Sequence, residues 1–501
     1  MFGLGADGGG QGVQAPQCRE PLELAGWQMG IVALGQGKEE QGQRGGFSIG
    51  ARDSTAYKLP DLGVFDLLAD YHTRLGPGSM PSALRTMTSV PKPQNEGSAW
   101  VCKRFWTDRS RAPILAAMTT KKPAASETGD PLLLTPGPLT TSASVKQAMV
   151  HDWGSRDAGF LAISKRVLDQ LVELAGAQGT HVTVPVQGSG TFAVEAMLTT
   201  FVPRTGKLLI LSNGAYGQRA QKIAEIAGLT VVTHETPEDT PPDLARLEKR
   251  LIDDQAISHV FAVHCETTSG ILNPIAEIAA IVAKQNCRLL VDAMSAFGAL
   301  EIDARTVRYD ALAASSNKCL QGVPGLGFVV CRNTALAKCK GNATTLVLDL
   351  FDQAEALART GQYRFTPPTH VIVALGQALE EHAAEGGVAG RGQRYRDNAK
   401  VLIDGMRAMG FQTLLPSELQ APIIVTFHMP TDPKFVFQRF YDGLKDRGYV
   451  IYPGKLTVAD SFRIGCIGRL YPEQMKGALA AVREVLDELQ VRSGAVMPAT
   501  K

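Results

Sequence analysis

The chain has 501 residues and a net charge of +2, with 44% hydrophobic and 20% charged residues. The length allows about two or three domains, and the composition is typical of a globular protein. The balanced charge, without a clustered basic stripe, argues against nucleic acid as a partner, and the lack of a long apolar run argues against a membrane span.

The start of the chain lacks the charged and apolar regions of a secretory signal. The eight cysteines include no CxxC pair of the kind that binds zinc. We therefore expect a cytoplasmic protein with reduced thiols and no bound metal.

Residues 1–129 differ in composition from the rest. Fourteen of the first fifty residues are glycine, and apolar periodicity is weak. This pattern predicts a disordered extension. Two alternatives are non-native sequence ahead of a translation start near Met118, and a short segment that binds a partner.

From Pro131 onward, short apolar runs alternate with helical stretches. Strands are predicted at 182–186, 207–211, 229–234, 259–264 and 287–291, and helices at 191–201, 220–227 and 275–283. Such alternation predicts a mostly parallel sheet covered by helices on both faces. Further on, strands at 423–427 and 461–464 and helices at 435–445 and from Pro472 to Leu489 predict a smaller α+β domain.

Two polar turns follow predicted strands of the large domain. The run QGSGT at 187–191 joins a strand to a helix, where backbone amides and the helix dipole favour an anion such as phosphate. An ordinary tight turn is the alternative. Asp292 ends the apolar run 289–291, at the sheet edge where ligands bind. It either caps the next helix or pairs with a protonated pyridine nitrogen.

Lys318 and Tyr216 each follow small or polar residues. Lys318 ends the run ASSNK, and in a small dry pocket its amine would have a lowered pKa and could bond to an aldehyde. Taken by itself, a surface lysine is the simpler interpretation. Tyr216 lies in the glycine-rich run NGAYG and is placed either to stack on a bound aromatic ring or to line a surface turn.

Two further positions bear polar groups on predicted strands or their ends. Thr267 lies in HCETTSG at 264–270 and could contact a cofactor oxygen, while His264 and Glu266 could be satisfied polar residues. Arg463 lies within a strand and either binds a substrate carboxylate in a two-pronged fashion or forms a salt bridge.

These runs occur in a family order. The chain resembles the class V, fold-type-I aminotransferases over residues 131–490, in the segments 134–138, 188–191, 292–295, 316–318 and 463–465. Within this class, three segments are most similar to the branch that transfers the amino group of 2-aminoethylphosphonate to pyruvate: 152–157, 264–270 and 364–370.

The resemblance implies an α/β fold with a large domain at 130–385 and a small C-terminal α+β domain at 386–495. Residues 130–150 form an arm packed on the small domain. It also implies pyridoxal 5′-phosphate as cofactor and a homodimer with active sites at the subunit interface. The substrates implied are 2-aminoethylphosphonate and pyruvate, with phosphonoacetaldehyde and L-alanine as products. An alanine–glyoxylate or serine–pyruvate type of transaminase is the alternative.

The resemblance also assigns roles residue by residue. Lys318 would hold the cofactor covalently, Asp292 would contact the pyridine nitrogen, and Tyr216 would stack on the ring. Phosphate contacts would come from Ser189, Gly190 and Thr191, with Thr366 reaching in from the neighbouring subunit. Thr267 would contact the ring hydroxyl and Arg463 the anionic end of the substrate. Ser155, Arg156 and Arg364 are possible helpers for the phosphonate or members of structural salt bridges.

Overall fold

The computed structural model describes residues 123–455 and 459–496. The prediction for residues 1–122 lies outside this range. Residues 123–129 differ from that prediction, because they make specific contacts with the C-terminal part of the chain. The Ala124 N–H donates to Arg447 O at 2.9 Å, and Glu127 pairs with Arg469 at 3.0 Å. In the described ranges, no helix has both the length and the apolar character that a membrane crossing requires.

A seven-stranded sheet forms the centre of the large domain. Its order is β2-β10-β9-β8-β5-β3-β4, in which only β10 runs against its neighbours. The mostly parallel sheet predicted from the sequence is therefore confirmed. In sheet order the strands are His181–Gln187, Leu326–Arg332, Ala311–Ser315, Arg288–Asp292, Ile257–Val263, Lys207–Ser212 and Thr230–Glu235.

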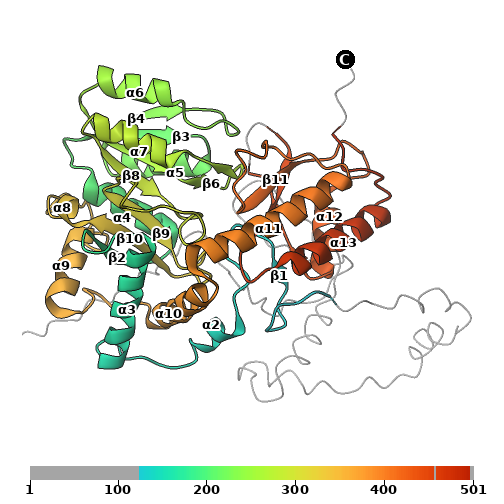
Figure 1. Cartoon of the computed structure of the whole chain (residues 1–501), viewed down its shortest axis with the longest axis horizontal. Coiled ribbons are helices and arrows are strands. Elements are labelled where there is room, and N and C mark those ends of the chain that lie inside the picture. Colours follow the sequence, from blue (N-terminus) through green and yellow to red (C-terminus); the bar gives the residue numbers. More distant parts are fainter. Residues whose placement is uncertain (1–122, 456–458, 497–501) are drawn as a thin grey trace, which may run out of the picture. The chain divides into compact units, whose positions relative to one another are not determined.

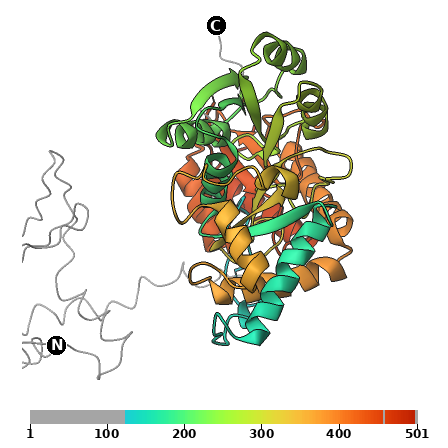
Figure 2. The ribbon, with the colours of Figure 1, turned by 90° about the vertical axis from the view of Figure 1, so that its left-hand side faces the viewer.

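Helices cover both faces of this sheet because its strands are apolar on both sides. In β3, Leu209 and Leu211 face one helical layer, whereas Leu208 and Ile210 face the other. The first layer holds α3 (Ala158–Leu174), α6 (Leu244–Asp253), α7 (Ile275–Lys284) and α10 (Thr369–Ala384). The second holds α4 (Gly190–Phe201), α5 (Ala215–Ile226), α8 (Asn333–Leu336) and α9 (Leu350–Thr360). α3 and α10 lie side by side, and the short α2 (Ala143–Gln147) packs on α10 (Figures 1 and 2).

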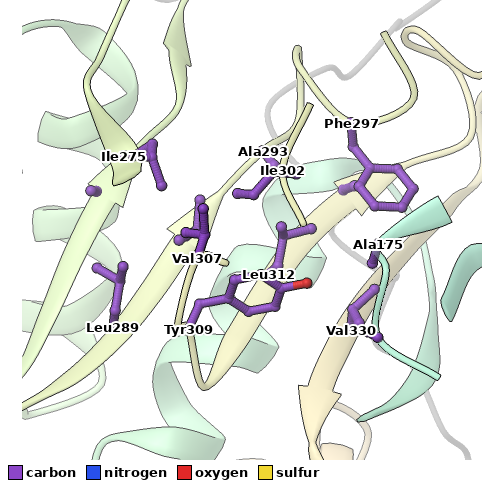
Figure 3. Close-up of a cluster of buried hydrophobic side chains, with 14 of the residues drawn as sticks. Ala175, Ile275, Leu289, Ala293, Phe297, Ile302, Val307, Tyr309, Leu312 and Val330 are labelled. Atoms are coloured by element: carbon purple, nitrogen blue, oxygen red, sulfur yellow. The ribbon is translucent and has the colours of Figure 1, made fainter. Parts of the chain in front are cut away.

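The first layer encloses the larger of these two cores. Figure 3 shows part of it, where side chains from strands, helices and the loop after β8 meet. Tyr309, Leu312 and Val330 are all fully buried there. Burial of each large apolar side chain stabilises the fold by roughly 1.5–3 kcal/mol. This core fixes the strands whose ends carry the polar turns.

The C-terminal part forms a separate, aromatic core. A three-stranded sheet, β11 (Ile424–His428), β14 (Ser461–Gly465) and β13 (Tyr452–Pro453), packs with α11 (Gly387–Ala408), α12 (Phe437–Asp446) and α13 (Pro472–Glu488). Phe427 and Phe462 stack in it with ring centroids 5.6 Å apart. The predicted smaller α+β unit is thus present, with its predicted strands and helices within about two residues of the observed bounds.

The segment that leads into the large domain lies against this smaller unit. β1 (Leu132–Leu133) pairs in parallel with β12 (Tyr449–Val450), and the Gly465 N–H donates to Leu134 O at 2.9 Å. A Cβ on Gly465 would lie 2.4 Å from Thr135 O. Glycine is therefore what allows the two backbones to approach so closely.

One predicted boundary is wrong. α5 begins at Ala215, five residues before the predicted start at Ala220. The reason is that its N-terminus is capped from elsewhere in the chain. The Ala215 N–H donates to Thr268 Oγ1 and the Tyr216 N–H to a Glu266 carboxylate oxygen, each at 3.1 Å. Partners this distant in sequence leave no local signal of a helix start.

Candidate active site

The polar turns of the large domain meet at one edge of the sheet. Six of its strands run in the same direction, so their carboxyl ends share that edge. A cavity of about 230 Å³ opens there. Six residues that the sequence analysis singled out line it: Ser189, Gly190, Thr191, Tyr216, Asp292 and Lys318. These six are just under half of the thirteen residues that line the cavity.

Lys318 follows β9, is half-buried as a residue and lines the cavity. Its Nζ donates to Pro136 O at 2.9 Å. Burial lowers its pKa to about 8, and the guanidiniums of Arg219 and Arg463 act in the same direction. Gly137 makes room for this side chain, because a Cβ there would lie 2.5 Å from Nζ. A buried amine of this kind is readily deprotonated and can act as a nucleophile.

Asp292 stands at the end of β8 and is also buried. Burial raises its pKa to about 6, and the nearby Glu266 carboxylate adds to this rise. One carboxylate oxygen accepts the Met294 N–H at 2.9 Å. The residue thus combines a local turn-capping bond with a place in the cavity wall. No helix lies between Asp292 and β9, so the helix-capping alternative is wrong and the bond caps a turn. The contact with a pyridine nitrogen stays a prediction.

The glycine-rich turn ends at the N-terminus of α4. Ser189 is the N-cap residue, but its hydroxyl makes no capping hydrogen bond to the helix. The first turn of α4 therefore presents backbone amides and hydroxyls toward the cavity. Arg219 joins this group from α5, where its Nη1 donates to Thr191 Oγ1 at 3.3 Å. The sequence analysis missed Arg219; its signal was a spacing of three residues from Tyr216, on the same face of a helix.

Two cations lie over the ring of Tyr216. The Arg219 guanidinium carbon is 4.9 Å from its ring centroid, and Lys455 Nζ is 5.1 Å away. Lys455 was also missed, because a lysine after a Pro-Gly turn has no distinctive sequence signal. Such contacts hold cations and ring together in a partly desolvated site.

Glu266 lies in the hairpin of β6 (Cys265–Glu266) and β7 (Ile271–Leu272) and is fully buried. Burial raises its pKa. Its carboxylate accepts the Thr268 hydroxyl at 2.5 Å and two backbone N–H groups at 3.1 Å, from Thr268 and Tyr216. These bonds make it a satisfied polar residue, as one reading of the sequence proposed, and tie the turn of Tyr216 to the hairpin.

Thr267 and Arg463 contact each other but do not line the 230 Å³ cavity, although the charge of Arg463 acts on Lys318. Arg463 Nη1 donates to Thr267 O at 2.9 Å, and its Nε donates to Pro453 O at 3.1 Å. The two residues come from different domains, so this contact joins the domains at the site. Arg463 has no carboxylate partner among the described residues, which argues against the salt-bridge alternative.

The remaining predicted positions lie elsewhere. Thr366 is exposed and lines a second cavity of about 410 Å³ together with Phe192 and Phe365. Arg364 pairs with Asp352 at 3.6 Å and donates to Asp349 O. Ser155 and Arg156 do not belong to the wall of the 230 Å³ cavity.

The donor groups of the site fit pyridoxal phosphate. Ser315 Oγ is buried in the cavity wall and has no hydrogen-bond partner within the described ranges. Arg219, Lys318, Lys455 and Arg463 contact carbonyl oxygens, a hydroxyl and a ring, but none pairs with a carboxylate in the part of the chain that the structure describes. A phosphate at the amides of α4 and an aldehyde at Lys318 would match this arrangement.

The fold and this site are those of an aminotransferase. Residues 142–435 match the family Aminotransferase class-V, and the chain belongs to this family. A relative from Pseudomonas putida, named 2-aminoethylphosphonate–pyruvate transaminase, is 53% identical over 361 residues, which are 72% of this chain and 98% of the relative. A second relative, from Burkholderia lata and named 2-aminoethylphosphonate–pyruvate transaminase 2, is 51% identical over 72% of this chain and 96% of its own length.

Solved structures agree on the fold. Alanine–glyoxylate aminotransferase from Nostoc sp. aligns with a TM-score of 0.67 at 26% identity, over 71% of this chain and 95% of that one. Pyridoxamine–pyruvate aminotransferase from Mesorhizobium loti also aligns with a TM-score of 0.67, at 24% identity, over 74% of this chain and 96% of that one. The expected fold-type-I architecture is thereby confirmed.

Proposed function

We propose that the chain is a pyridoxal-phosphate-dependent aminotransferase that transfers the amino group of 2-aminoethylphosphonate to pyruvate, giving phosphonoacetaldehyde and L-alanine. The observation that carries this proposal is one cavity lined by a half-buried lysine of lowered pKa, a buried aspartate and the amide-rich turn of α4. The choice of substrates rests on the names of relatives at 51–53% identity.

The side chains of the site divide the work as follows. Lys318 holds the cofactor and, once its amine is free, moves a proton between the substrate carbon and the cofactor; a pKa of about 8 suits both donation and acceptance near neutral pH. Asp292 keeps the pyridine nitrogen protonated, and Tyr216 supports the face of the ring. When bound, pyridoxal phosphate supplies an electron sink for charge that develops on the substrate carbon.

The anion contacts complete the set of roles. Ser189, Gly190 and Thr191 hold the cofactor phosphate at the N-terminus of α4, Thr267 contacts the ring hydroxyl, and Arg463 binds the anionic end of the substrate. We further propose a cytoplasmic homodimer in which Thr366 reaches the phosphate of the neighbouring subunit. Its support is the exposed position of Thr366 beside apolar side chains.

The test is a spectrum of the purified protein before and after addition of 2-aminoethylphosphonate. The proposal expects a near-visible band that shifts on addition of this amine and returns with pyruvate. Lys318→Ala should lose the band and the turnover, while Lys222→Ala, at an exposed position of α5, should keep both. A Lys318→Ala protein with normal activity would refute the assignment of the lysine.

The choice of amino donor has its own test. Initial rates with 2-aminoethylphosphonate, alanine and serine, each against pyruvate or glyoxylate, separate the proposed activity from the alternative transaminases. Equal or faster rates with alanine or serine would overturn the phosphonate assignment but leave the aminotransferase assignment intact.

A further inference from the structure

We propose that Lys455 acts with Arg463 as a two-cation binding site for the phosphonate group, and that Lys455 makes the enzyme favour a phosphonate over a carboxylate at this end of the substrate. This inference rests on the proposed function and identifies a residue that determines its specificity. It concerns a side chain that no motif in the sequence singled out.

Lys455 and Arg463 belong to one hairpin of the small domain. Lys455 follows β13, and β13 pairs with β14 through Tyr452 and Arg463. Lys455 Nζ lies over the ring of Tyr216, 5.1 Å from its centroid, so the hairpin carries this amine across to the large domain at the site. Lys455 is exposed as a residue, and partial desolvation together with the positive charges of Arg219 and Arg463 lowers its pKa, as expected for cations that share one small region.

Two backbone contacts hold Arg463 in place and leave other N–H donors of its guanidinium available. Its Nε and Nη1 donate to the carbonyl oxygens of Pro453 and Thr267, at 3.1 and 2.9 Å. A guanidinium has five N–H donors, so three remain for a ligand. The backbone contacts fix the plane of the guanidinium before any substrate arrives, which reduces the entropy lost on binding.

The site holds more positive than negative charge. Within residues 123–455 and 459–496, Arg219, Lys318, Lys455 and Arg463 lie near two acids, Glu266 and Asp292, and burial raises the pKa of both. Unpaired charges in a partly buried site are costly, so an anionic ligand is the natural partner. Arg219 contacts Thr191 at the turn assigned to the cofactor phosphate. Lys455 and Arg463 are left for the substrate.

The kind of cation indicates the kind of anion. The forked guanidinium of Arg463 suffices for a carboxylate, which has two oxygens and one negative charge. A phosphonate has three oxygens and up to two negative charges, and an additional ammonium such as that of Lys455 suits the third oxygen and the second charge. Pyruvate carries a carboxylate, so its binding should depend on Arg463 and much less on Lys455.

The experiment compares Lys455→Gln and Lys455→Arg with the wild-type holoenzyme and with Lys476→Gln, a change at an exposed position of α13. Loss of one charge-assisted contact should raise the KM for 2-aminoethylphosphonate about tenfold. The KM for pyruvate should change less than about twofold, and Lys455→Arg should restore most of the phosphonate affinity. An equal rise of both KM values, or no rise of either, would overturn the proposal.

A binding measurement separates this inference from the proposed function. Methylphosphonate and acetate are titrated against each holoenzyme by calorimetry, which requires no turnover. Lys455→Gln should weaken methylphosphonate about tenfold and leave acetate nearly unchanged. If wild type binds methylphosphonate in this Lys455-dependent way but fails to transaminate 2-aminoethylphosphonate, the proposed function fails and the phosphonate site stands. If turnover is normal but the affinity for methylphosphonate does not depend on Lys455, the proposed function stands and the inference fails.

Discussion

Two buried carboxylates of the site have different amounts of hydrogen-bonding capacity left. Glu266 accepts bonds from the Thr268 hydroxyl, the Thr268 N–H and the Tyr216 N–H. Asp292 accepts one bond, from the Met294 N–H. A carboxylate offers about four acceptor sites. Glu266 is therefore committed to the turns that carry Tyr216, whereas Asp292 keeps capacity for a ligand in the cavity.

This difference leads to a prediction for Asp292→Asn. The amide oxygen still accepts the Met294 N–H, so the fold and its melting temperature should stay close to those of wild type. The negative charge that would keep a pyridine nitrogen protonated is lost, and kcat should fall by roughly 10²–10³, as for other losses of preorganised electrostatics. Steady-state kinetics and a thermal melt measure both effects.

Asp169→Asn, on the exposed face of α3, provides the matched control and should leave kcat unchanged. If Asp292→Asn kept wild-type kcat, Asp292 would be a turn-capping residue alone. If instead the variant unfolded, the charge of Asp292, and not its retained bond to Met294, would be needed for stability.

The sequence reveals some of these residues better than others. Lys318 and Asp292 each lie at or just after the end of an apolar strand. A residue in such a place is expected at the edge of the sheet where ligands bind. The positions of Arg219 and Lys455 cannot be predicted in this way, because their approach to Tyr216 depends on how a helix and a hairpin pack in three dimensions. Residues placed by packing between elements leave little local pattern.

At the scale of the elements, the same distinction holds. The strands predicted at 182–186 and 207–211 match β2 and β3 closely, since runs of buried aliphatic residues are a local property. The start of α5 was missed, since its cap comes from the hairpin at Glu266 and Thr268. The two-residue strand β1 was also beyond prediction, because only its pairing with β12 makes it a strand.

The segment after β1 connects the small domain to Lys318, the proposed cofactor lysine. In β14, the Gly465 N–H donates to Leu134 O. Two residues further along the segment, Pro136 O accepts the hydrogen bond from Lys318 Nζ. We expect Gly465→Val to separate the two backbones, because a Cβ would lie 2.4 Å from Thr135 O and 2.6 Å from its carbonyl carbon. Stability should fall by about 1–3 kcal/mol, as for other overpacked sites, and Lys318 should lose its anchor.

The measurements are urea unfolding and the absorption of the bound cofactor. Gly376→Ala in α10 serves as the control, because the added Cβ would lie 3.4 Å from a methyl group of Val167, an ordinary van der Waals contact. This variant should be as stable as wild type or slightly more stable. A Gly465→Val protein with normal stability and normal cofactor binding would show that the segment 134–137 does not position Lys318.

At the scale of the whole molecule, one part of the surface remains apolar. Phe192, Val347 and Phe365 line the 410 Å³ cavity, and their exposed fractions are 49%, 65% and 49%. Phe192 adjoins Thr191 in the first turn of α4, so this surface begins where the turn proposed to bind the cofactor phosphate ends. Clustered exposed apolar side chains of this kind mark an interface with another chain. Thr366 lines the same cavity, so an interface formed on this surface would include it.

The prediction is that Phe365→Asp weakens the dimer and the activity together. A charge within an apolar interface is costly to desolvate and has no partner there, so the affinity between subunits should fall at least tenfold. Light scattering should report twice the chain mass of 53.6 kDa for wild type and a concentration-dependent loss of that mass for the variant. Ile252→Asp, which is equally exposed but lies on α6, should remain dimeric and active. Activity that recovers when the variant is concentrated would tie catalysis to association. A fully active monomer would instead show that the site is complete within one chain and that Thr366 of a second copy is dispensable.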